Sequence, residues 1–215
     1  MGDAAWLDDG SANGLWVMGG GNAQRRYSTD AATTWQRLPV GTLAHYRRLA
    51  SGGARAAATA DMGLSFIQTA PGQTPPLTWT DHAIAGITEP SLAMGAGGVA
   101  VAVWWDTACH YFSGAAWRAC TLARAPRAIT SVVNDGTSFL VLGRDPPYVS
   151  TNGMTYTQSA TTAGTDFRQV RFGGGIYVAP DIKQWSMDGI AWRAMTTPPT
   201  FTVTDVEVGT LGACP

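Results

Sequence analysis

The chain has 215 residues, of which 45% are hydrophobic and 13% are charged, and its formal net charge is −1 at pH 7. This balance provides no excess of Lys and Arg for phosphate groups, so nucleic acid and anionic membranes are disfavoured as partners. No apolar run approaches the roughly 18 residues of a membrane helix. The 26 glycines and 12 prolines are typical of a turn-rich, all-β protein.

Short apolar segments that end at small residues recur along the chain and predict β-strands. In chain order they are Leu15–Gly19, Val99–Val103, Phe139–Gly143 and Ile176–Ala179. A second set lies just before Gly-rich turns and comprises Arg48–Gly52, Ser91–Gly95, Ser131–Gly136 and Gln169–Gly173. We find no long segment with the apolar spacing of a helix. The pattern therefore predicts about four short strands in each repeat.

A hydroxyl residue, an Asp or Asn, small residues and an aromatic form a short motif with three clear copies. The copies are Ser28–Trp35, Ser150–Tyr156 and Ser186–Trp192. Such residues favour a tight hairpin turn, because the Asx side chain can bond backbone amides while the aromatic covers the turn. The residues that we assign to this structural role are Ser28, Asp30, Trp35, Ser150, Asn152, Tyr156, Ser186, Asp188 and Trp192. Each copy supplies a single Asx side chain, whereas Ca²⁺ requires six to eight oxygens, so we expect turn caps and no calcium site.

Two weaker copies, Ser113–Trp117 and the stretch from Thr69 to Trp79, complete a period. The closing aromatics at positions 35, 79, 117, 156 and 192 are 36 to 44 residues apart. Four-stranded repeats of about 40 residues are typical of propeller blades. We therefore predict one all-β domain, a five-bladed β-propeller of antiparallel blades. The expected blades are residues 1–40 together with 202–209, then 41–84, 85–124, 125–162 and 163–201.

The strand that closes the ring has two candidates. Residues 202–209 follow the last motif at the distance expected for an innermost strand, and they can pair with the N-terminal repeat to remove open edges. The competing segment is Ala5–Gly10. If it is the first inner strand, residues 202–209 must pair elsewhere, for example on a partner chain.

The turn motif resembles the Asp-box, or bacterial neuraminidase repeat, with the pattern Ser-x-Asp-x-Gly-x-Thr-Trp. The copy at Ser28–Trp35 matches except that Ala32 replaces Gly, and the other two clear copies match a form that is one residue shorter. The resemblance implies a β-propeller in which the motif joins the third and fourth strands of a blade, away from any active centre. It thus implies a fold more than a function.

Sialidases of that family suggest an enzyme as the alternative function, with arginines that hold the substrate carboxylate and with catalytic acids. The nearest arginine motifs are Tyr46–Leu49 and Phe167–Val170, and neither is complete; the acids that we place on inner strands are Glu89, Asp205 and Glu207. Glycosidases usually employ two carboxylates, and this chain has only two glutamates in total. We therefore assign no catalytic residue and favour a protein that is not an enzyme.

A binding or assembly module is the function that we favour, with glycan or other protein subunits as partners. The candidate ligand-binding residues are Trp104, Trp105, Arg47, Arg168 and Arg171. Adjacent strand residues such as Trp104 and Trp105 face opposite sides of a sheet, although a buried contact between blades is the stronger expectation for them. The low charge and the absence of a signal sequence at the N-terminus suit cytoplasmic synthesis, assembly into an oligomer and a phage virion.

Cysteine and histidine usage gives no indication of a cofactor or metal. His45, His82 and His110 are scattered, and no spaced Cys/His cluster is present in the sequence. Cys109 and Cys120 flank the turn at Ser113–Trp117 and could face each other across a hairpin. In a cytosolic product, buried small hydrophobic thiols are the favoured interpretation. Cys214 completes the set of three.

Overall fold

The computed structural model describes residues 3–8, 10–68, 77–84, 91–95, 97–104, 108–160 and 166–198. These residues form β-strands joined by turns and loops, and they contain no helix. Within these ranges there is accordingly no helix that could span a membrane. The all-β prediction is confirmed.

The strands form five sheets, each built on four consecutive antiparallel strands. The first sheet contains β1 (Asp3–Leu7), β2 (Leu15–Gly19), β3 (Arg25–Ser28) and β4 (Gln36–Arg37). The second contains β5 (Tyr46–Gly52), β6 (Arg55–Ala60), β7 (Gly63–Gln68) and β8 (Thr78–Ala83). The third contains β9 (Ser91–Met94), β10 (Ala100–Trp104), β11 (Ala108–Phe112) and β12 (Trp117–Ala119). The fifth contains β18 (Arg171–Gly173), β19 (Ile176–Ala179), β20 (Gln184–Ser186) and β21 (Arg193–Ala194).

The fourth sheet has an additional strand. It contains β14 (Ile129–Asn134), β15 (Phe139–Gly143), β16 (Tyr148–Ser150) and β17 (Thr155–Gln158), and β13 (Thr121–Leu122) pairs with β17 in parallel. Residues 121 and 122 were expected in the third blade. They belong to the fourth sheet because the linker that leaves the third sheet runs along the outer edge of the next one.

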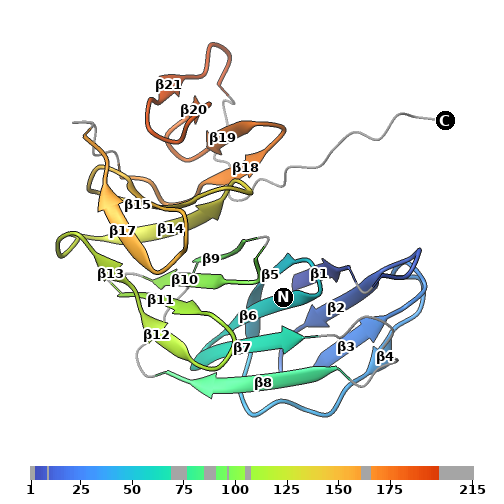
Figure 1. The fold of residues 1–215 in the computed structure, drawn as a ribbon. Coiled ribbons are helices and arrows are strands. Elements are labelled where there is room, and N and C mark those ends of the chain that lie inside the picture. The colour runs from blue at the N-terminus through green and yellow to red at the C-terminus, as the bar shows by residue number, and fades with distance from the viewer. Residues whose placement is uncertain are drawn as a thin grey trace.

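The sheets follow one another in chain order, and their first strands lie toward the centre of the molecule (Figure 1). Successive inner strands are in contact, since β1 meets β5, β5 meets β9, β9 meets β14, and β14 meets β18. No strand of the fifth sheet pairs with the first sheet within the described residues. The arrangement is that of propeller-type sheets around a common centre.

The inner position of the first sheet is held by β1, which pairs with β2 from Asp3 opposite Gly19 to Leu7 opposite Leu15. The N-terminal segment, one of the two candidates for the first inner strand, therefore holds this position. Residues 202–209, the other candidate, lie outside the described residues.

The faces between sheets are packed by the apolar half of each alternating strand. In β2, Leu15 and Val17 are buried and pack with Ile67 of the second sheet, whereas Trp16 and Met18 on the opposite face are only half-buried. Between the third and fourth sheets the core includes Val101, Val103, Val132, Val141, Tyr148 and Tyr156. Alternation thus places a core between neighbouring sheets.

A buried ionic network also joins the first sheet to the second. Arg25 of β3 and Asp81 of β8 form an ion pair whose two side chains are each 8% exposed. Asp81 also accepts hydrogen bonds from Thr42 N and Oγ1 at 2.7 Å and from Ser65 Oγ at 2.5 Å. The Arg25 guanidinium donates to the Tyr46 hydroxyl and lies 4.8 Å from the Trp79 ring. Each charge is therefore compensated by several partners.

Cys109 and Cys120 form a disulfide, with Cα atoms 5.3 Å apart. This overturns the interpretation of the two residues as free, buried thiols. The backbone explains the pairing, because Cys120 N donates to Cys109 O at 2.9 Å and so brings the two residues side by side at the end of the β11–β12 hairpin.

Candidate functional site

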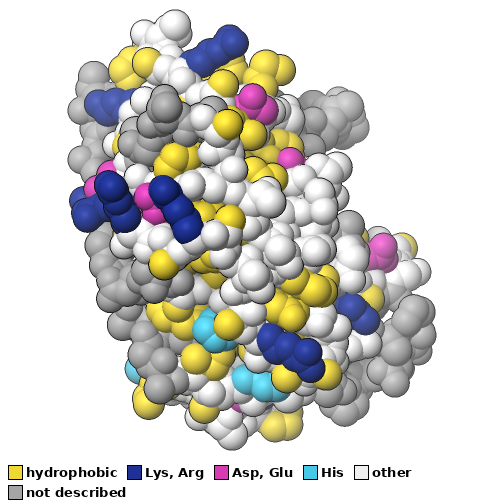
Figure 2. Space-filling model, turned by 60° about the vertical axis from the view of Figure 1, so that its left-hand side comes forward, with side chains coloured by type: hydrophobic (Ala, Val, Ile, Leu, Met, Phe, Trp, Pro, Cys, Tyr) yellow, Lys and Arg dark blue, Asp and Glu magenta, His cyan; other side chains and the backbone are white. Residues whose placement is uncertain are grey.

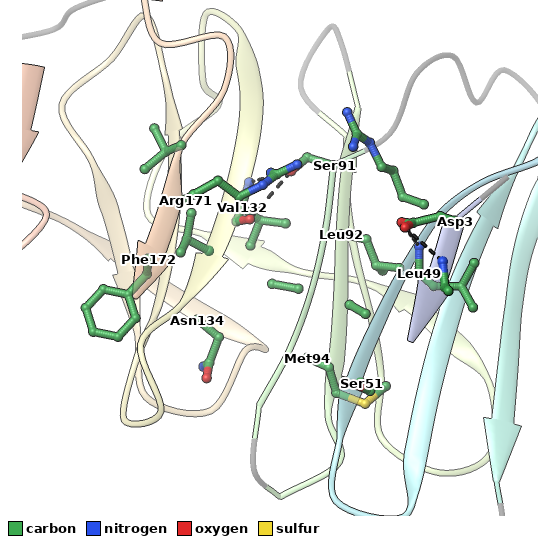
Figure 3. A pocket seen from close by; sticks show the side chains of 16 residues that line it. Asp3, Leu49, Ser51, Ser91, Leu92, Met94, Val132, Asn134, Arg171 and Phe172 are labelled. Atoms are coloured by element: carbon green, nitrogen blue, oxygen red, sulfur yellow. Dashed lines mark hydrogen bonds between the residues drawn. The ribbon is translucent and has the colours of Figure 1, made fainter. Parts of the chain in front are cut away.

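The candidate site is a cavity of about 280 Å³ at the centre of the molecule. It is lined by residues of β1, β5, β9, β14 and β18 and by Val170 just before β18, so every sheet contributes its innermost strand (Figure 3). A cavity built from five separate repeats can vary its side chains without changing the strands that hold them.

Short polar side chains link the inner strands around the cavity. Asp3 Oδ2 accepts from Leu49 N at 2.8 Å and so joins the first sheet to the second. Ser91 Oγ accepts from Val132 N at 3.1 Å, joining the third to the fourth, and Ser131 Oγ accepts from Val170 N at 3.2 Å, joining the fourth to the segment that leads into the fifth. These bonds occupy backbone groups that no neighbouring strand pairs.

Two arginines, Arg48 and Arg171, supply positive charge to the lining, and both are half-buried. In Figure 3, Arg171 extends from β18 toward Ser91 and Val132, at the same end of the cavity as Asp3. Asn134, Met94 and Ser51 lie toward the other end. Among the described lining residues Arg48 and Arg171 are the basic ones and Asp3 is the acidic one.

The motif turns lie at the opposite end of the sheets from the arginines. In the fourth sheet, Ser150 pairs with Phe139, which pairs with Asn134 at the end of the inner strand. In the fifth sheet, Ser186 pairs with Tyr177 next to the β18–β19 turn, whereas Arg171 begins the inner strand. The charged end of the cavity is therefore formed by the loops and not by the motif turns.

Each motif turn is held by the same hydrogen bonds. The serine hydroxyl bonds the Asx Oδ1 at 2.6 Å for Ser28 and Asp30, and at 2.9 Å for the other two pairs. The serine oxygen also accepts from a backbone amide in a left-handed conformation, at Ala32, Gly153 or Gly189. The hydrogen bond from Ser28, then those from Thr34, lower the pKa of Asp30 to about 2. These contacts describe a structural turn.

The aromatics of the turns differ in exposure. Tyr156 is fully buried in the core between the third and fourth sheets. Trp35 and Trp192 are half-buried, and Trp192 Nε1 donates to Gly189 O at 3.0 Å.

Of the five ligand-binding residues expected from the sequence, Arg171 lies in the cavity. Arg47 is exposed and pairs with Asp61 at 2.7 Å. Arg168 is exposed, and its backbone amide donates to Asp181 at 2.9 Å. Trp104 is 6% exposed, stacks on His110 and packs with Leu64 of the second sheet. Trp105 lies outside the described residues.

Sequence reasoning did not select Arg48, Asp3 or Ser91 as site residues. Arg48 and Ser91 begin segments that were predicted to be inner strands. That position was the available signal, because the start of an inner strand lies at the end of the sheet opposite the motif turns. Glu89, Asp205 and Glu207 lie outside the described residues. Within the described ranges, no group of three or more His, Cys, Asp or Glu side chains is placed to hold a metal ion.

No protein-family model and no curated protein matches the sequence. Several solved β-propellers match the structure. YCF48 bound to D1 peptide is 15% identical, with a TM-score of 0.56 over 89% of this chain and 66% of that one. The GH74 enzyme of Niastella koreensis is 16% identical, with a TM-score of 0.60 over 90% and 30%. AztD of Citrobacter koseri is 11% identical, with a TM-score of 0.61 over 92% and 60%.

The chain thus spans about two thirds or less of the length of these three proteins. At such low identity the likeness concerns the fold alone. It agrees with the antiparallel four-stranded sheets and the inner strands described above, and the protein has a β-propeller-like, all-β fold.

Proposed function

We propose that this protein is a binding module that holds a segment of a partner protein at the arginine end of its central cavity. The observation that carries the proposal is the cavity itself. Inner strands from all five sheets line it, and two of them, β5 and β18, contribute Arg48 and Arg171. In this proposal the five sheets are blades of one Asp-box-type propeller ring.

The charge of the lining favours an anionic group on the ligand. Guanidinium groups bind carboxylates through paired, charge-assisted hydrogen bonds. Asp3, the acid of the described lining, accepts bonds from Leu49 N and from Ala4 N at 2.9 Å and serves the backbone. A carboxylate at a peptide end or on an acidic side chain therefore complements this end of the cavity.

A protein partner is supported by the YCF48 structure, which contains a bound peptide. Glycoside hydrolysis is less well supported, because a pair of carboxylates usually flanks the scissile bond and the described lining contains Asp3 alone. A glycan ligand and a virion setting are further proposals that rest on composition. The glycan ligand is included in the test below.

The test compares wild-type protein with the Arg48→Gln/Arg171→Gln double variant on a peptide array and a glycan array. Arg118→Gln, which removes an exposed arginine of β12, is the matched control. We expect binding to peptides with a free carboxylate, its loss in the double variant and its retention in the control. Equal binding by all three proteins would reject the cavity as the site. Turnover of a fluorogenic sialoside would replace the proposal with a hydrolase.

A further inference from the structure

A second basic region lies on two loops next to the fourth sheet. The linker Arg124-Ala125-Pro126-Arg127 and the turn Arg144-Asp145-Pro146-Pro147 are held together, since Arg144 N donates to Ala128 O at 3.1 Å. Gly143 permits this approach, because a Cβ there would lie 1.9 Å from Ala128 O. The prolines further restrict both backbones. The loops thus form a preorganised surface.

One buried carboxylate organises the arginines of this surface. Asp145 has a side chain that is 5% exposed; it accepts from Arg127 N at 2.6 Å and from the Arg124 guanidinium at 3.4 Å. The Arg127 side chain is 83% exposed, and its Nε is 3.9 Å from Asp145, beyond hydrogen-bond distance. Within the described residues the Arg127 guanidinium donates no hydrogen bond, although a guanidinium offers five donors.

The hydroxyl of Tyr148 lies beside Arg124 and Asp145. Tyr148 is 1% exposed. Burial raises the pKa of this hydroxyl, hydrogen bonding to Arg124 lowers it, and the charge of Asp145 raises it. The tyrosine therefore belongs to the same polar group of side chains as Arg124 and Asp145.

Arg144 adds a further positive charge beside these loops, in an ion pair with Asp166 at 3.3 Å in which both side chains are about half exposed. Figure 2, turned to bring this side of the molecule forward, shows basic side chains gathered beside acidic ones. The region therefore carries three arginines and two carboxylates, one of them buried.

We propose that Arg124 and Arg127, organised by Asp145, form a docking surface for an acidic segment of a partner protein. The two exposed guanidiniums offer paired donors to Asp or Glu carboxylates. The interspersed Asp166 would repel a polymer with a phosphate at every step, whereas a protein segment can place neutral or donor groups there. This surface is separate from the cavity lining, so it goes beyond the function proposed above.

The test measures the affinity of a short, fluorescein-labelled Glu-rich peptide by fluorescence anisotropy. Arg124→Gln/Arg127→Gln should weaken binding about tenfold or more, and Arg124→Lys/Arg127→Lys should weaken it less, because charge remains while paired geometry is lost. Arg118→Gln is the control and should bind as the wild type does. Thermal melting establishes that each variant is folded.

Independently of any variant, the peptide should protect Arg124 and Arg127 of the wild-type protein from phenylglyoxal, as read by mass spectrometry. Unchanged affinity in the double variant, or unchanged modification, would overturn the proposal. Tighter binding of an oligonucleotide than of the Glu-rich peptide would also overturn it. Loss of peptide binding only in Arg48→Gln/Arg171→Gln would overturn this surface while supporting the cavity.

Discussion

Two interfaces between successive sheets of this molecule are secured by different chemistry. Between the first and second sheets a buried ionic network joins Arg25 to Asp81, whereas the contact between the third and fourth sheets is mainly apolar, and the disulfide of the β11–β12 hairpin lies at its edge. The repeats share strands and turns but not the side chains that lock neighbours together. The difference shows that the repeated sequence pattern can specify a four-stranded sheet, while each interface between sheets depends on its own set of side chains.

Removing the carboxylate of the polar interface should have the largest effect. Asp81→Ala leaves Arg25 buried without its anion, so we expect the free energy of unfolding to fall by about 3–5 kcal/mol. Asp61→Ala, which removes the partner of the exposed Arg47, should cost at most about 1 kcal/mol. Urea denaturation of both variants measures the contrast, and similar small losses would show that the buried pair does not secure the interface.

Reducing the disulfide tests the other interface. The bond closes a short loop, with a sequence separation of 11, and its loss should lower the free energy of unfolding by about 2–3 kcal/mol. Denaturation with and without a reductant measures this loss. The Cys109→Ala/Cys120→Ala variant should no longer respond to the reductant, and a persistent response would place the redox-sensitive bond elsewhere.

Acid should weaken the polar interface selectively. Burial alone would raise the pKa of Asp81, but hydrogen bonds from Ser65 and Thr42 and the charge of Arg25 lower it to about 2. Because the folded-state pKa is below the unfolded one, the stabilisation is complete above about pH 4 and is lost as the pH falls toward 2, at a cost of about 2 kcal/mol. Denaturation across this range should show a smaller decline in Asp81→Asn than in the wild type.

The smallest effect concerns the motif turns. Ala32 has φ of 63°, in the region where the other two clear copies have Gly153 at 72° and Gly189 at 71°. Ala32→Gly should raise the free energy of unfolding by about 0.5–1 kcal/mol, because glycine adopts this conformation without strain. Gly153→Ala should do the opposite, since its Cβ would also lie 2.9 Å from Val101. Thermal melting measures both changes in stability. A change in the same direction in both variants would refute the explanation.

Local features of the fold were predictable from the sequence. The segments Leu15–Gly19, Phe139–Gly143 and Ile176–Ala179 are strands with the expected bounds, because apolar runs between turn residues define short strands well. The turns at Ser150 and Ser186 were also accessible, since their hydrogen bonds lie within a few residues.

Long-range pairings were not predictable. Arg25 and Asp81 are 56 residues apart, and nothing in either local sequence marks the partner. The position of the two arginines in the cavity depends on which end of each inner strand lies opposite the motif turns. In addition, Arg48 follows a bulge between Tyr46 and Arg48 that the sequence does not indicate. The disulfide required knowledge of how β11 and the end of β12 align.

The parallel pairing of β13 with β17 has a consequence for behaviour at high concentration. The outer strands β4, β12 and β21 are only two or three residues long and give another chain little to pair with, whereas β8, the outer strand of the second sheet, has six residues. β17 has four residues, and its free backbone groups are met by Thr121 and Leu122 of the preceding linker. The linker between the third and fourth sheets therefore also covers the edge of β17, where a strand of another molecule could otherwise pair.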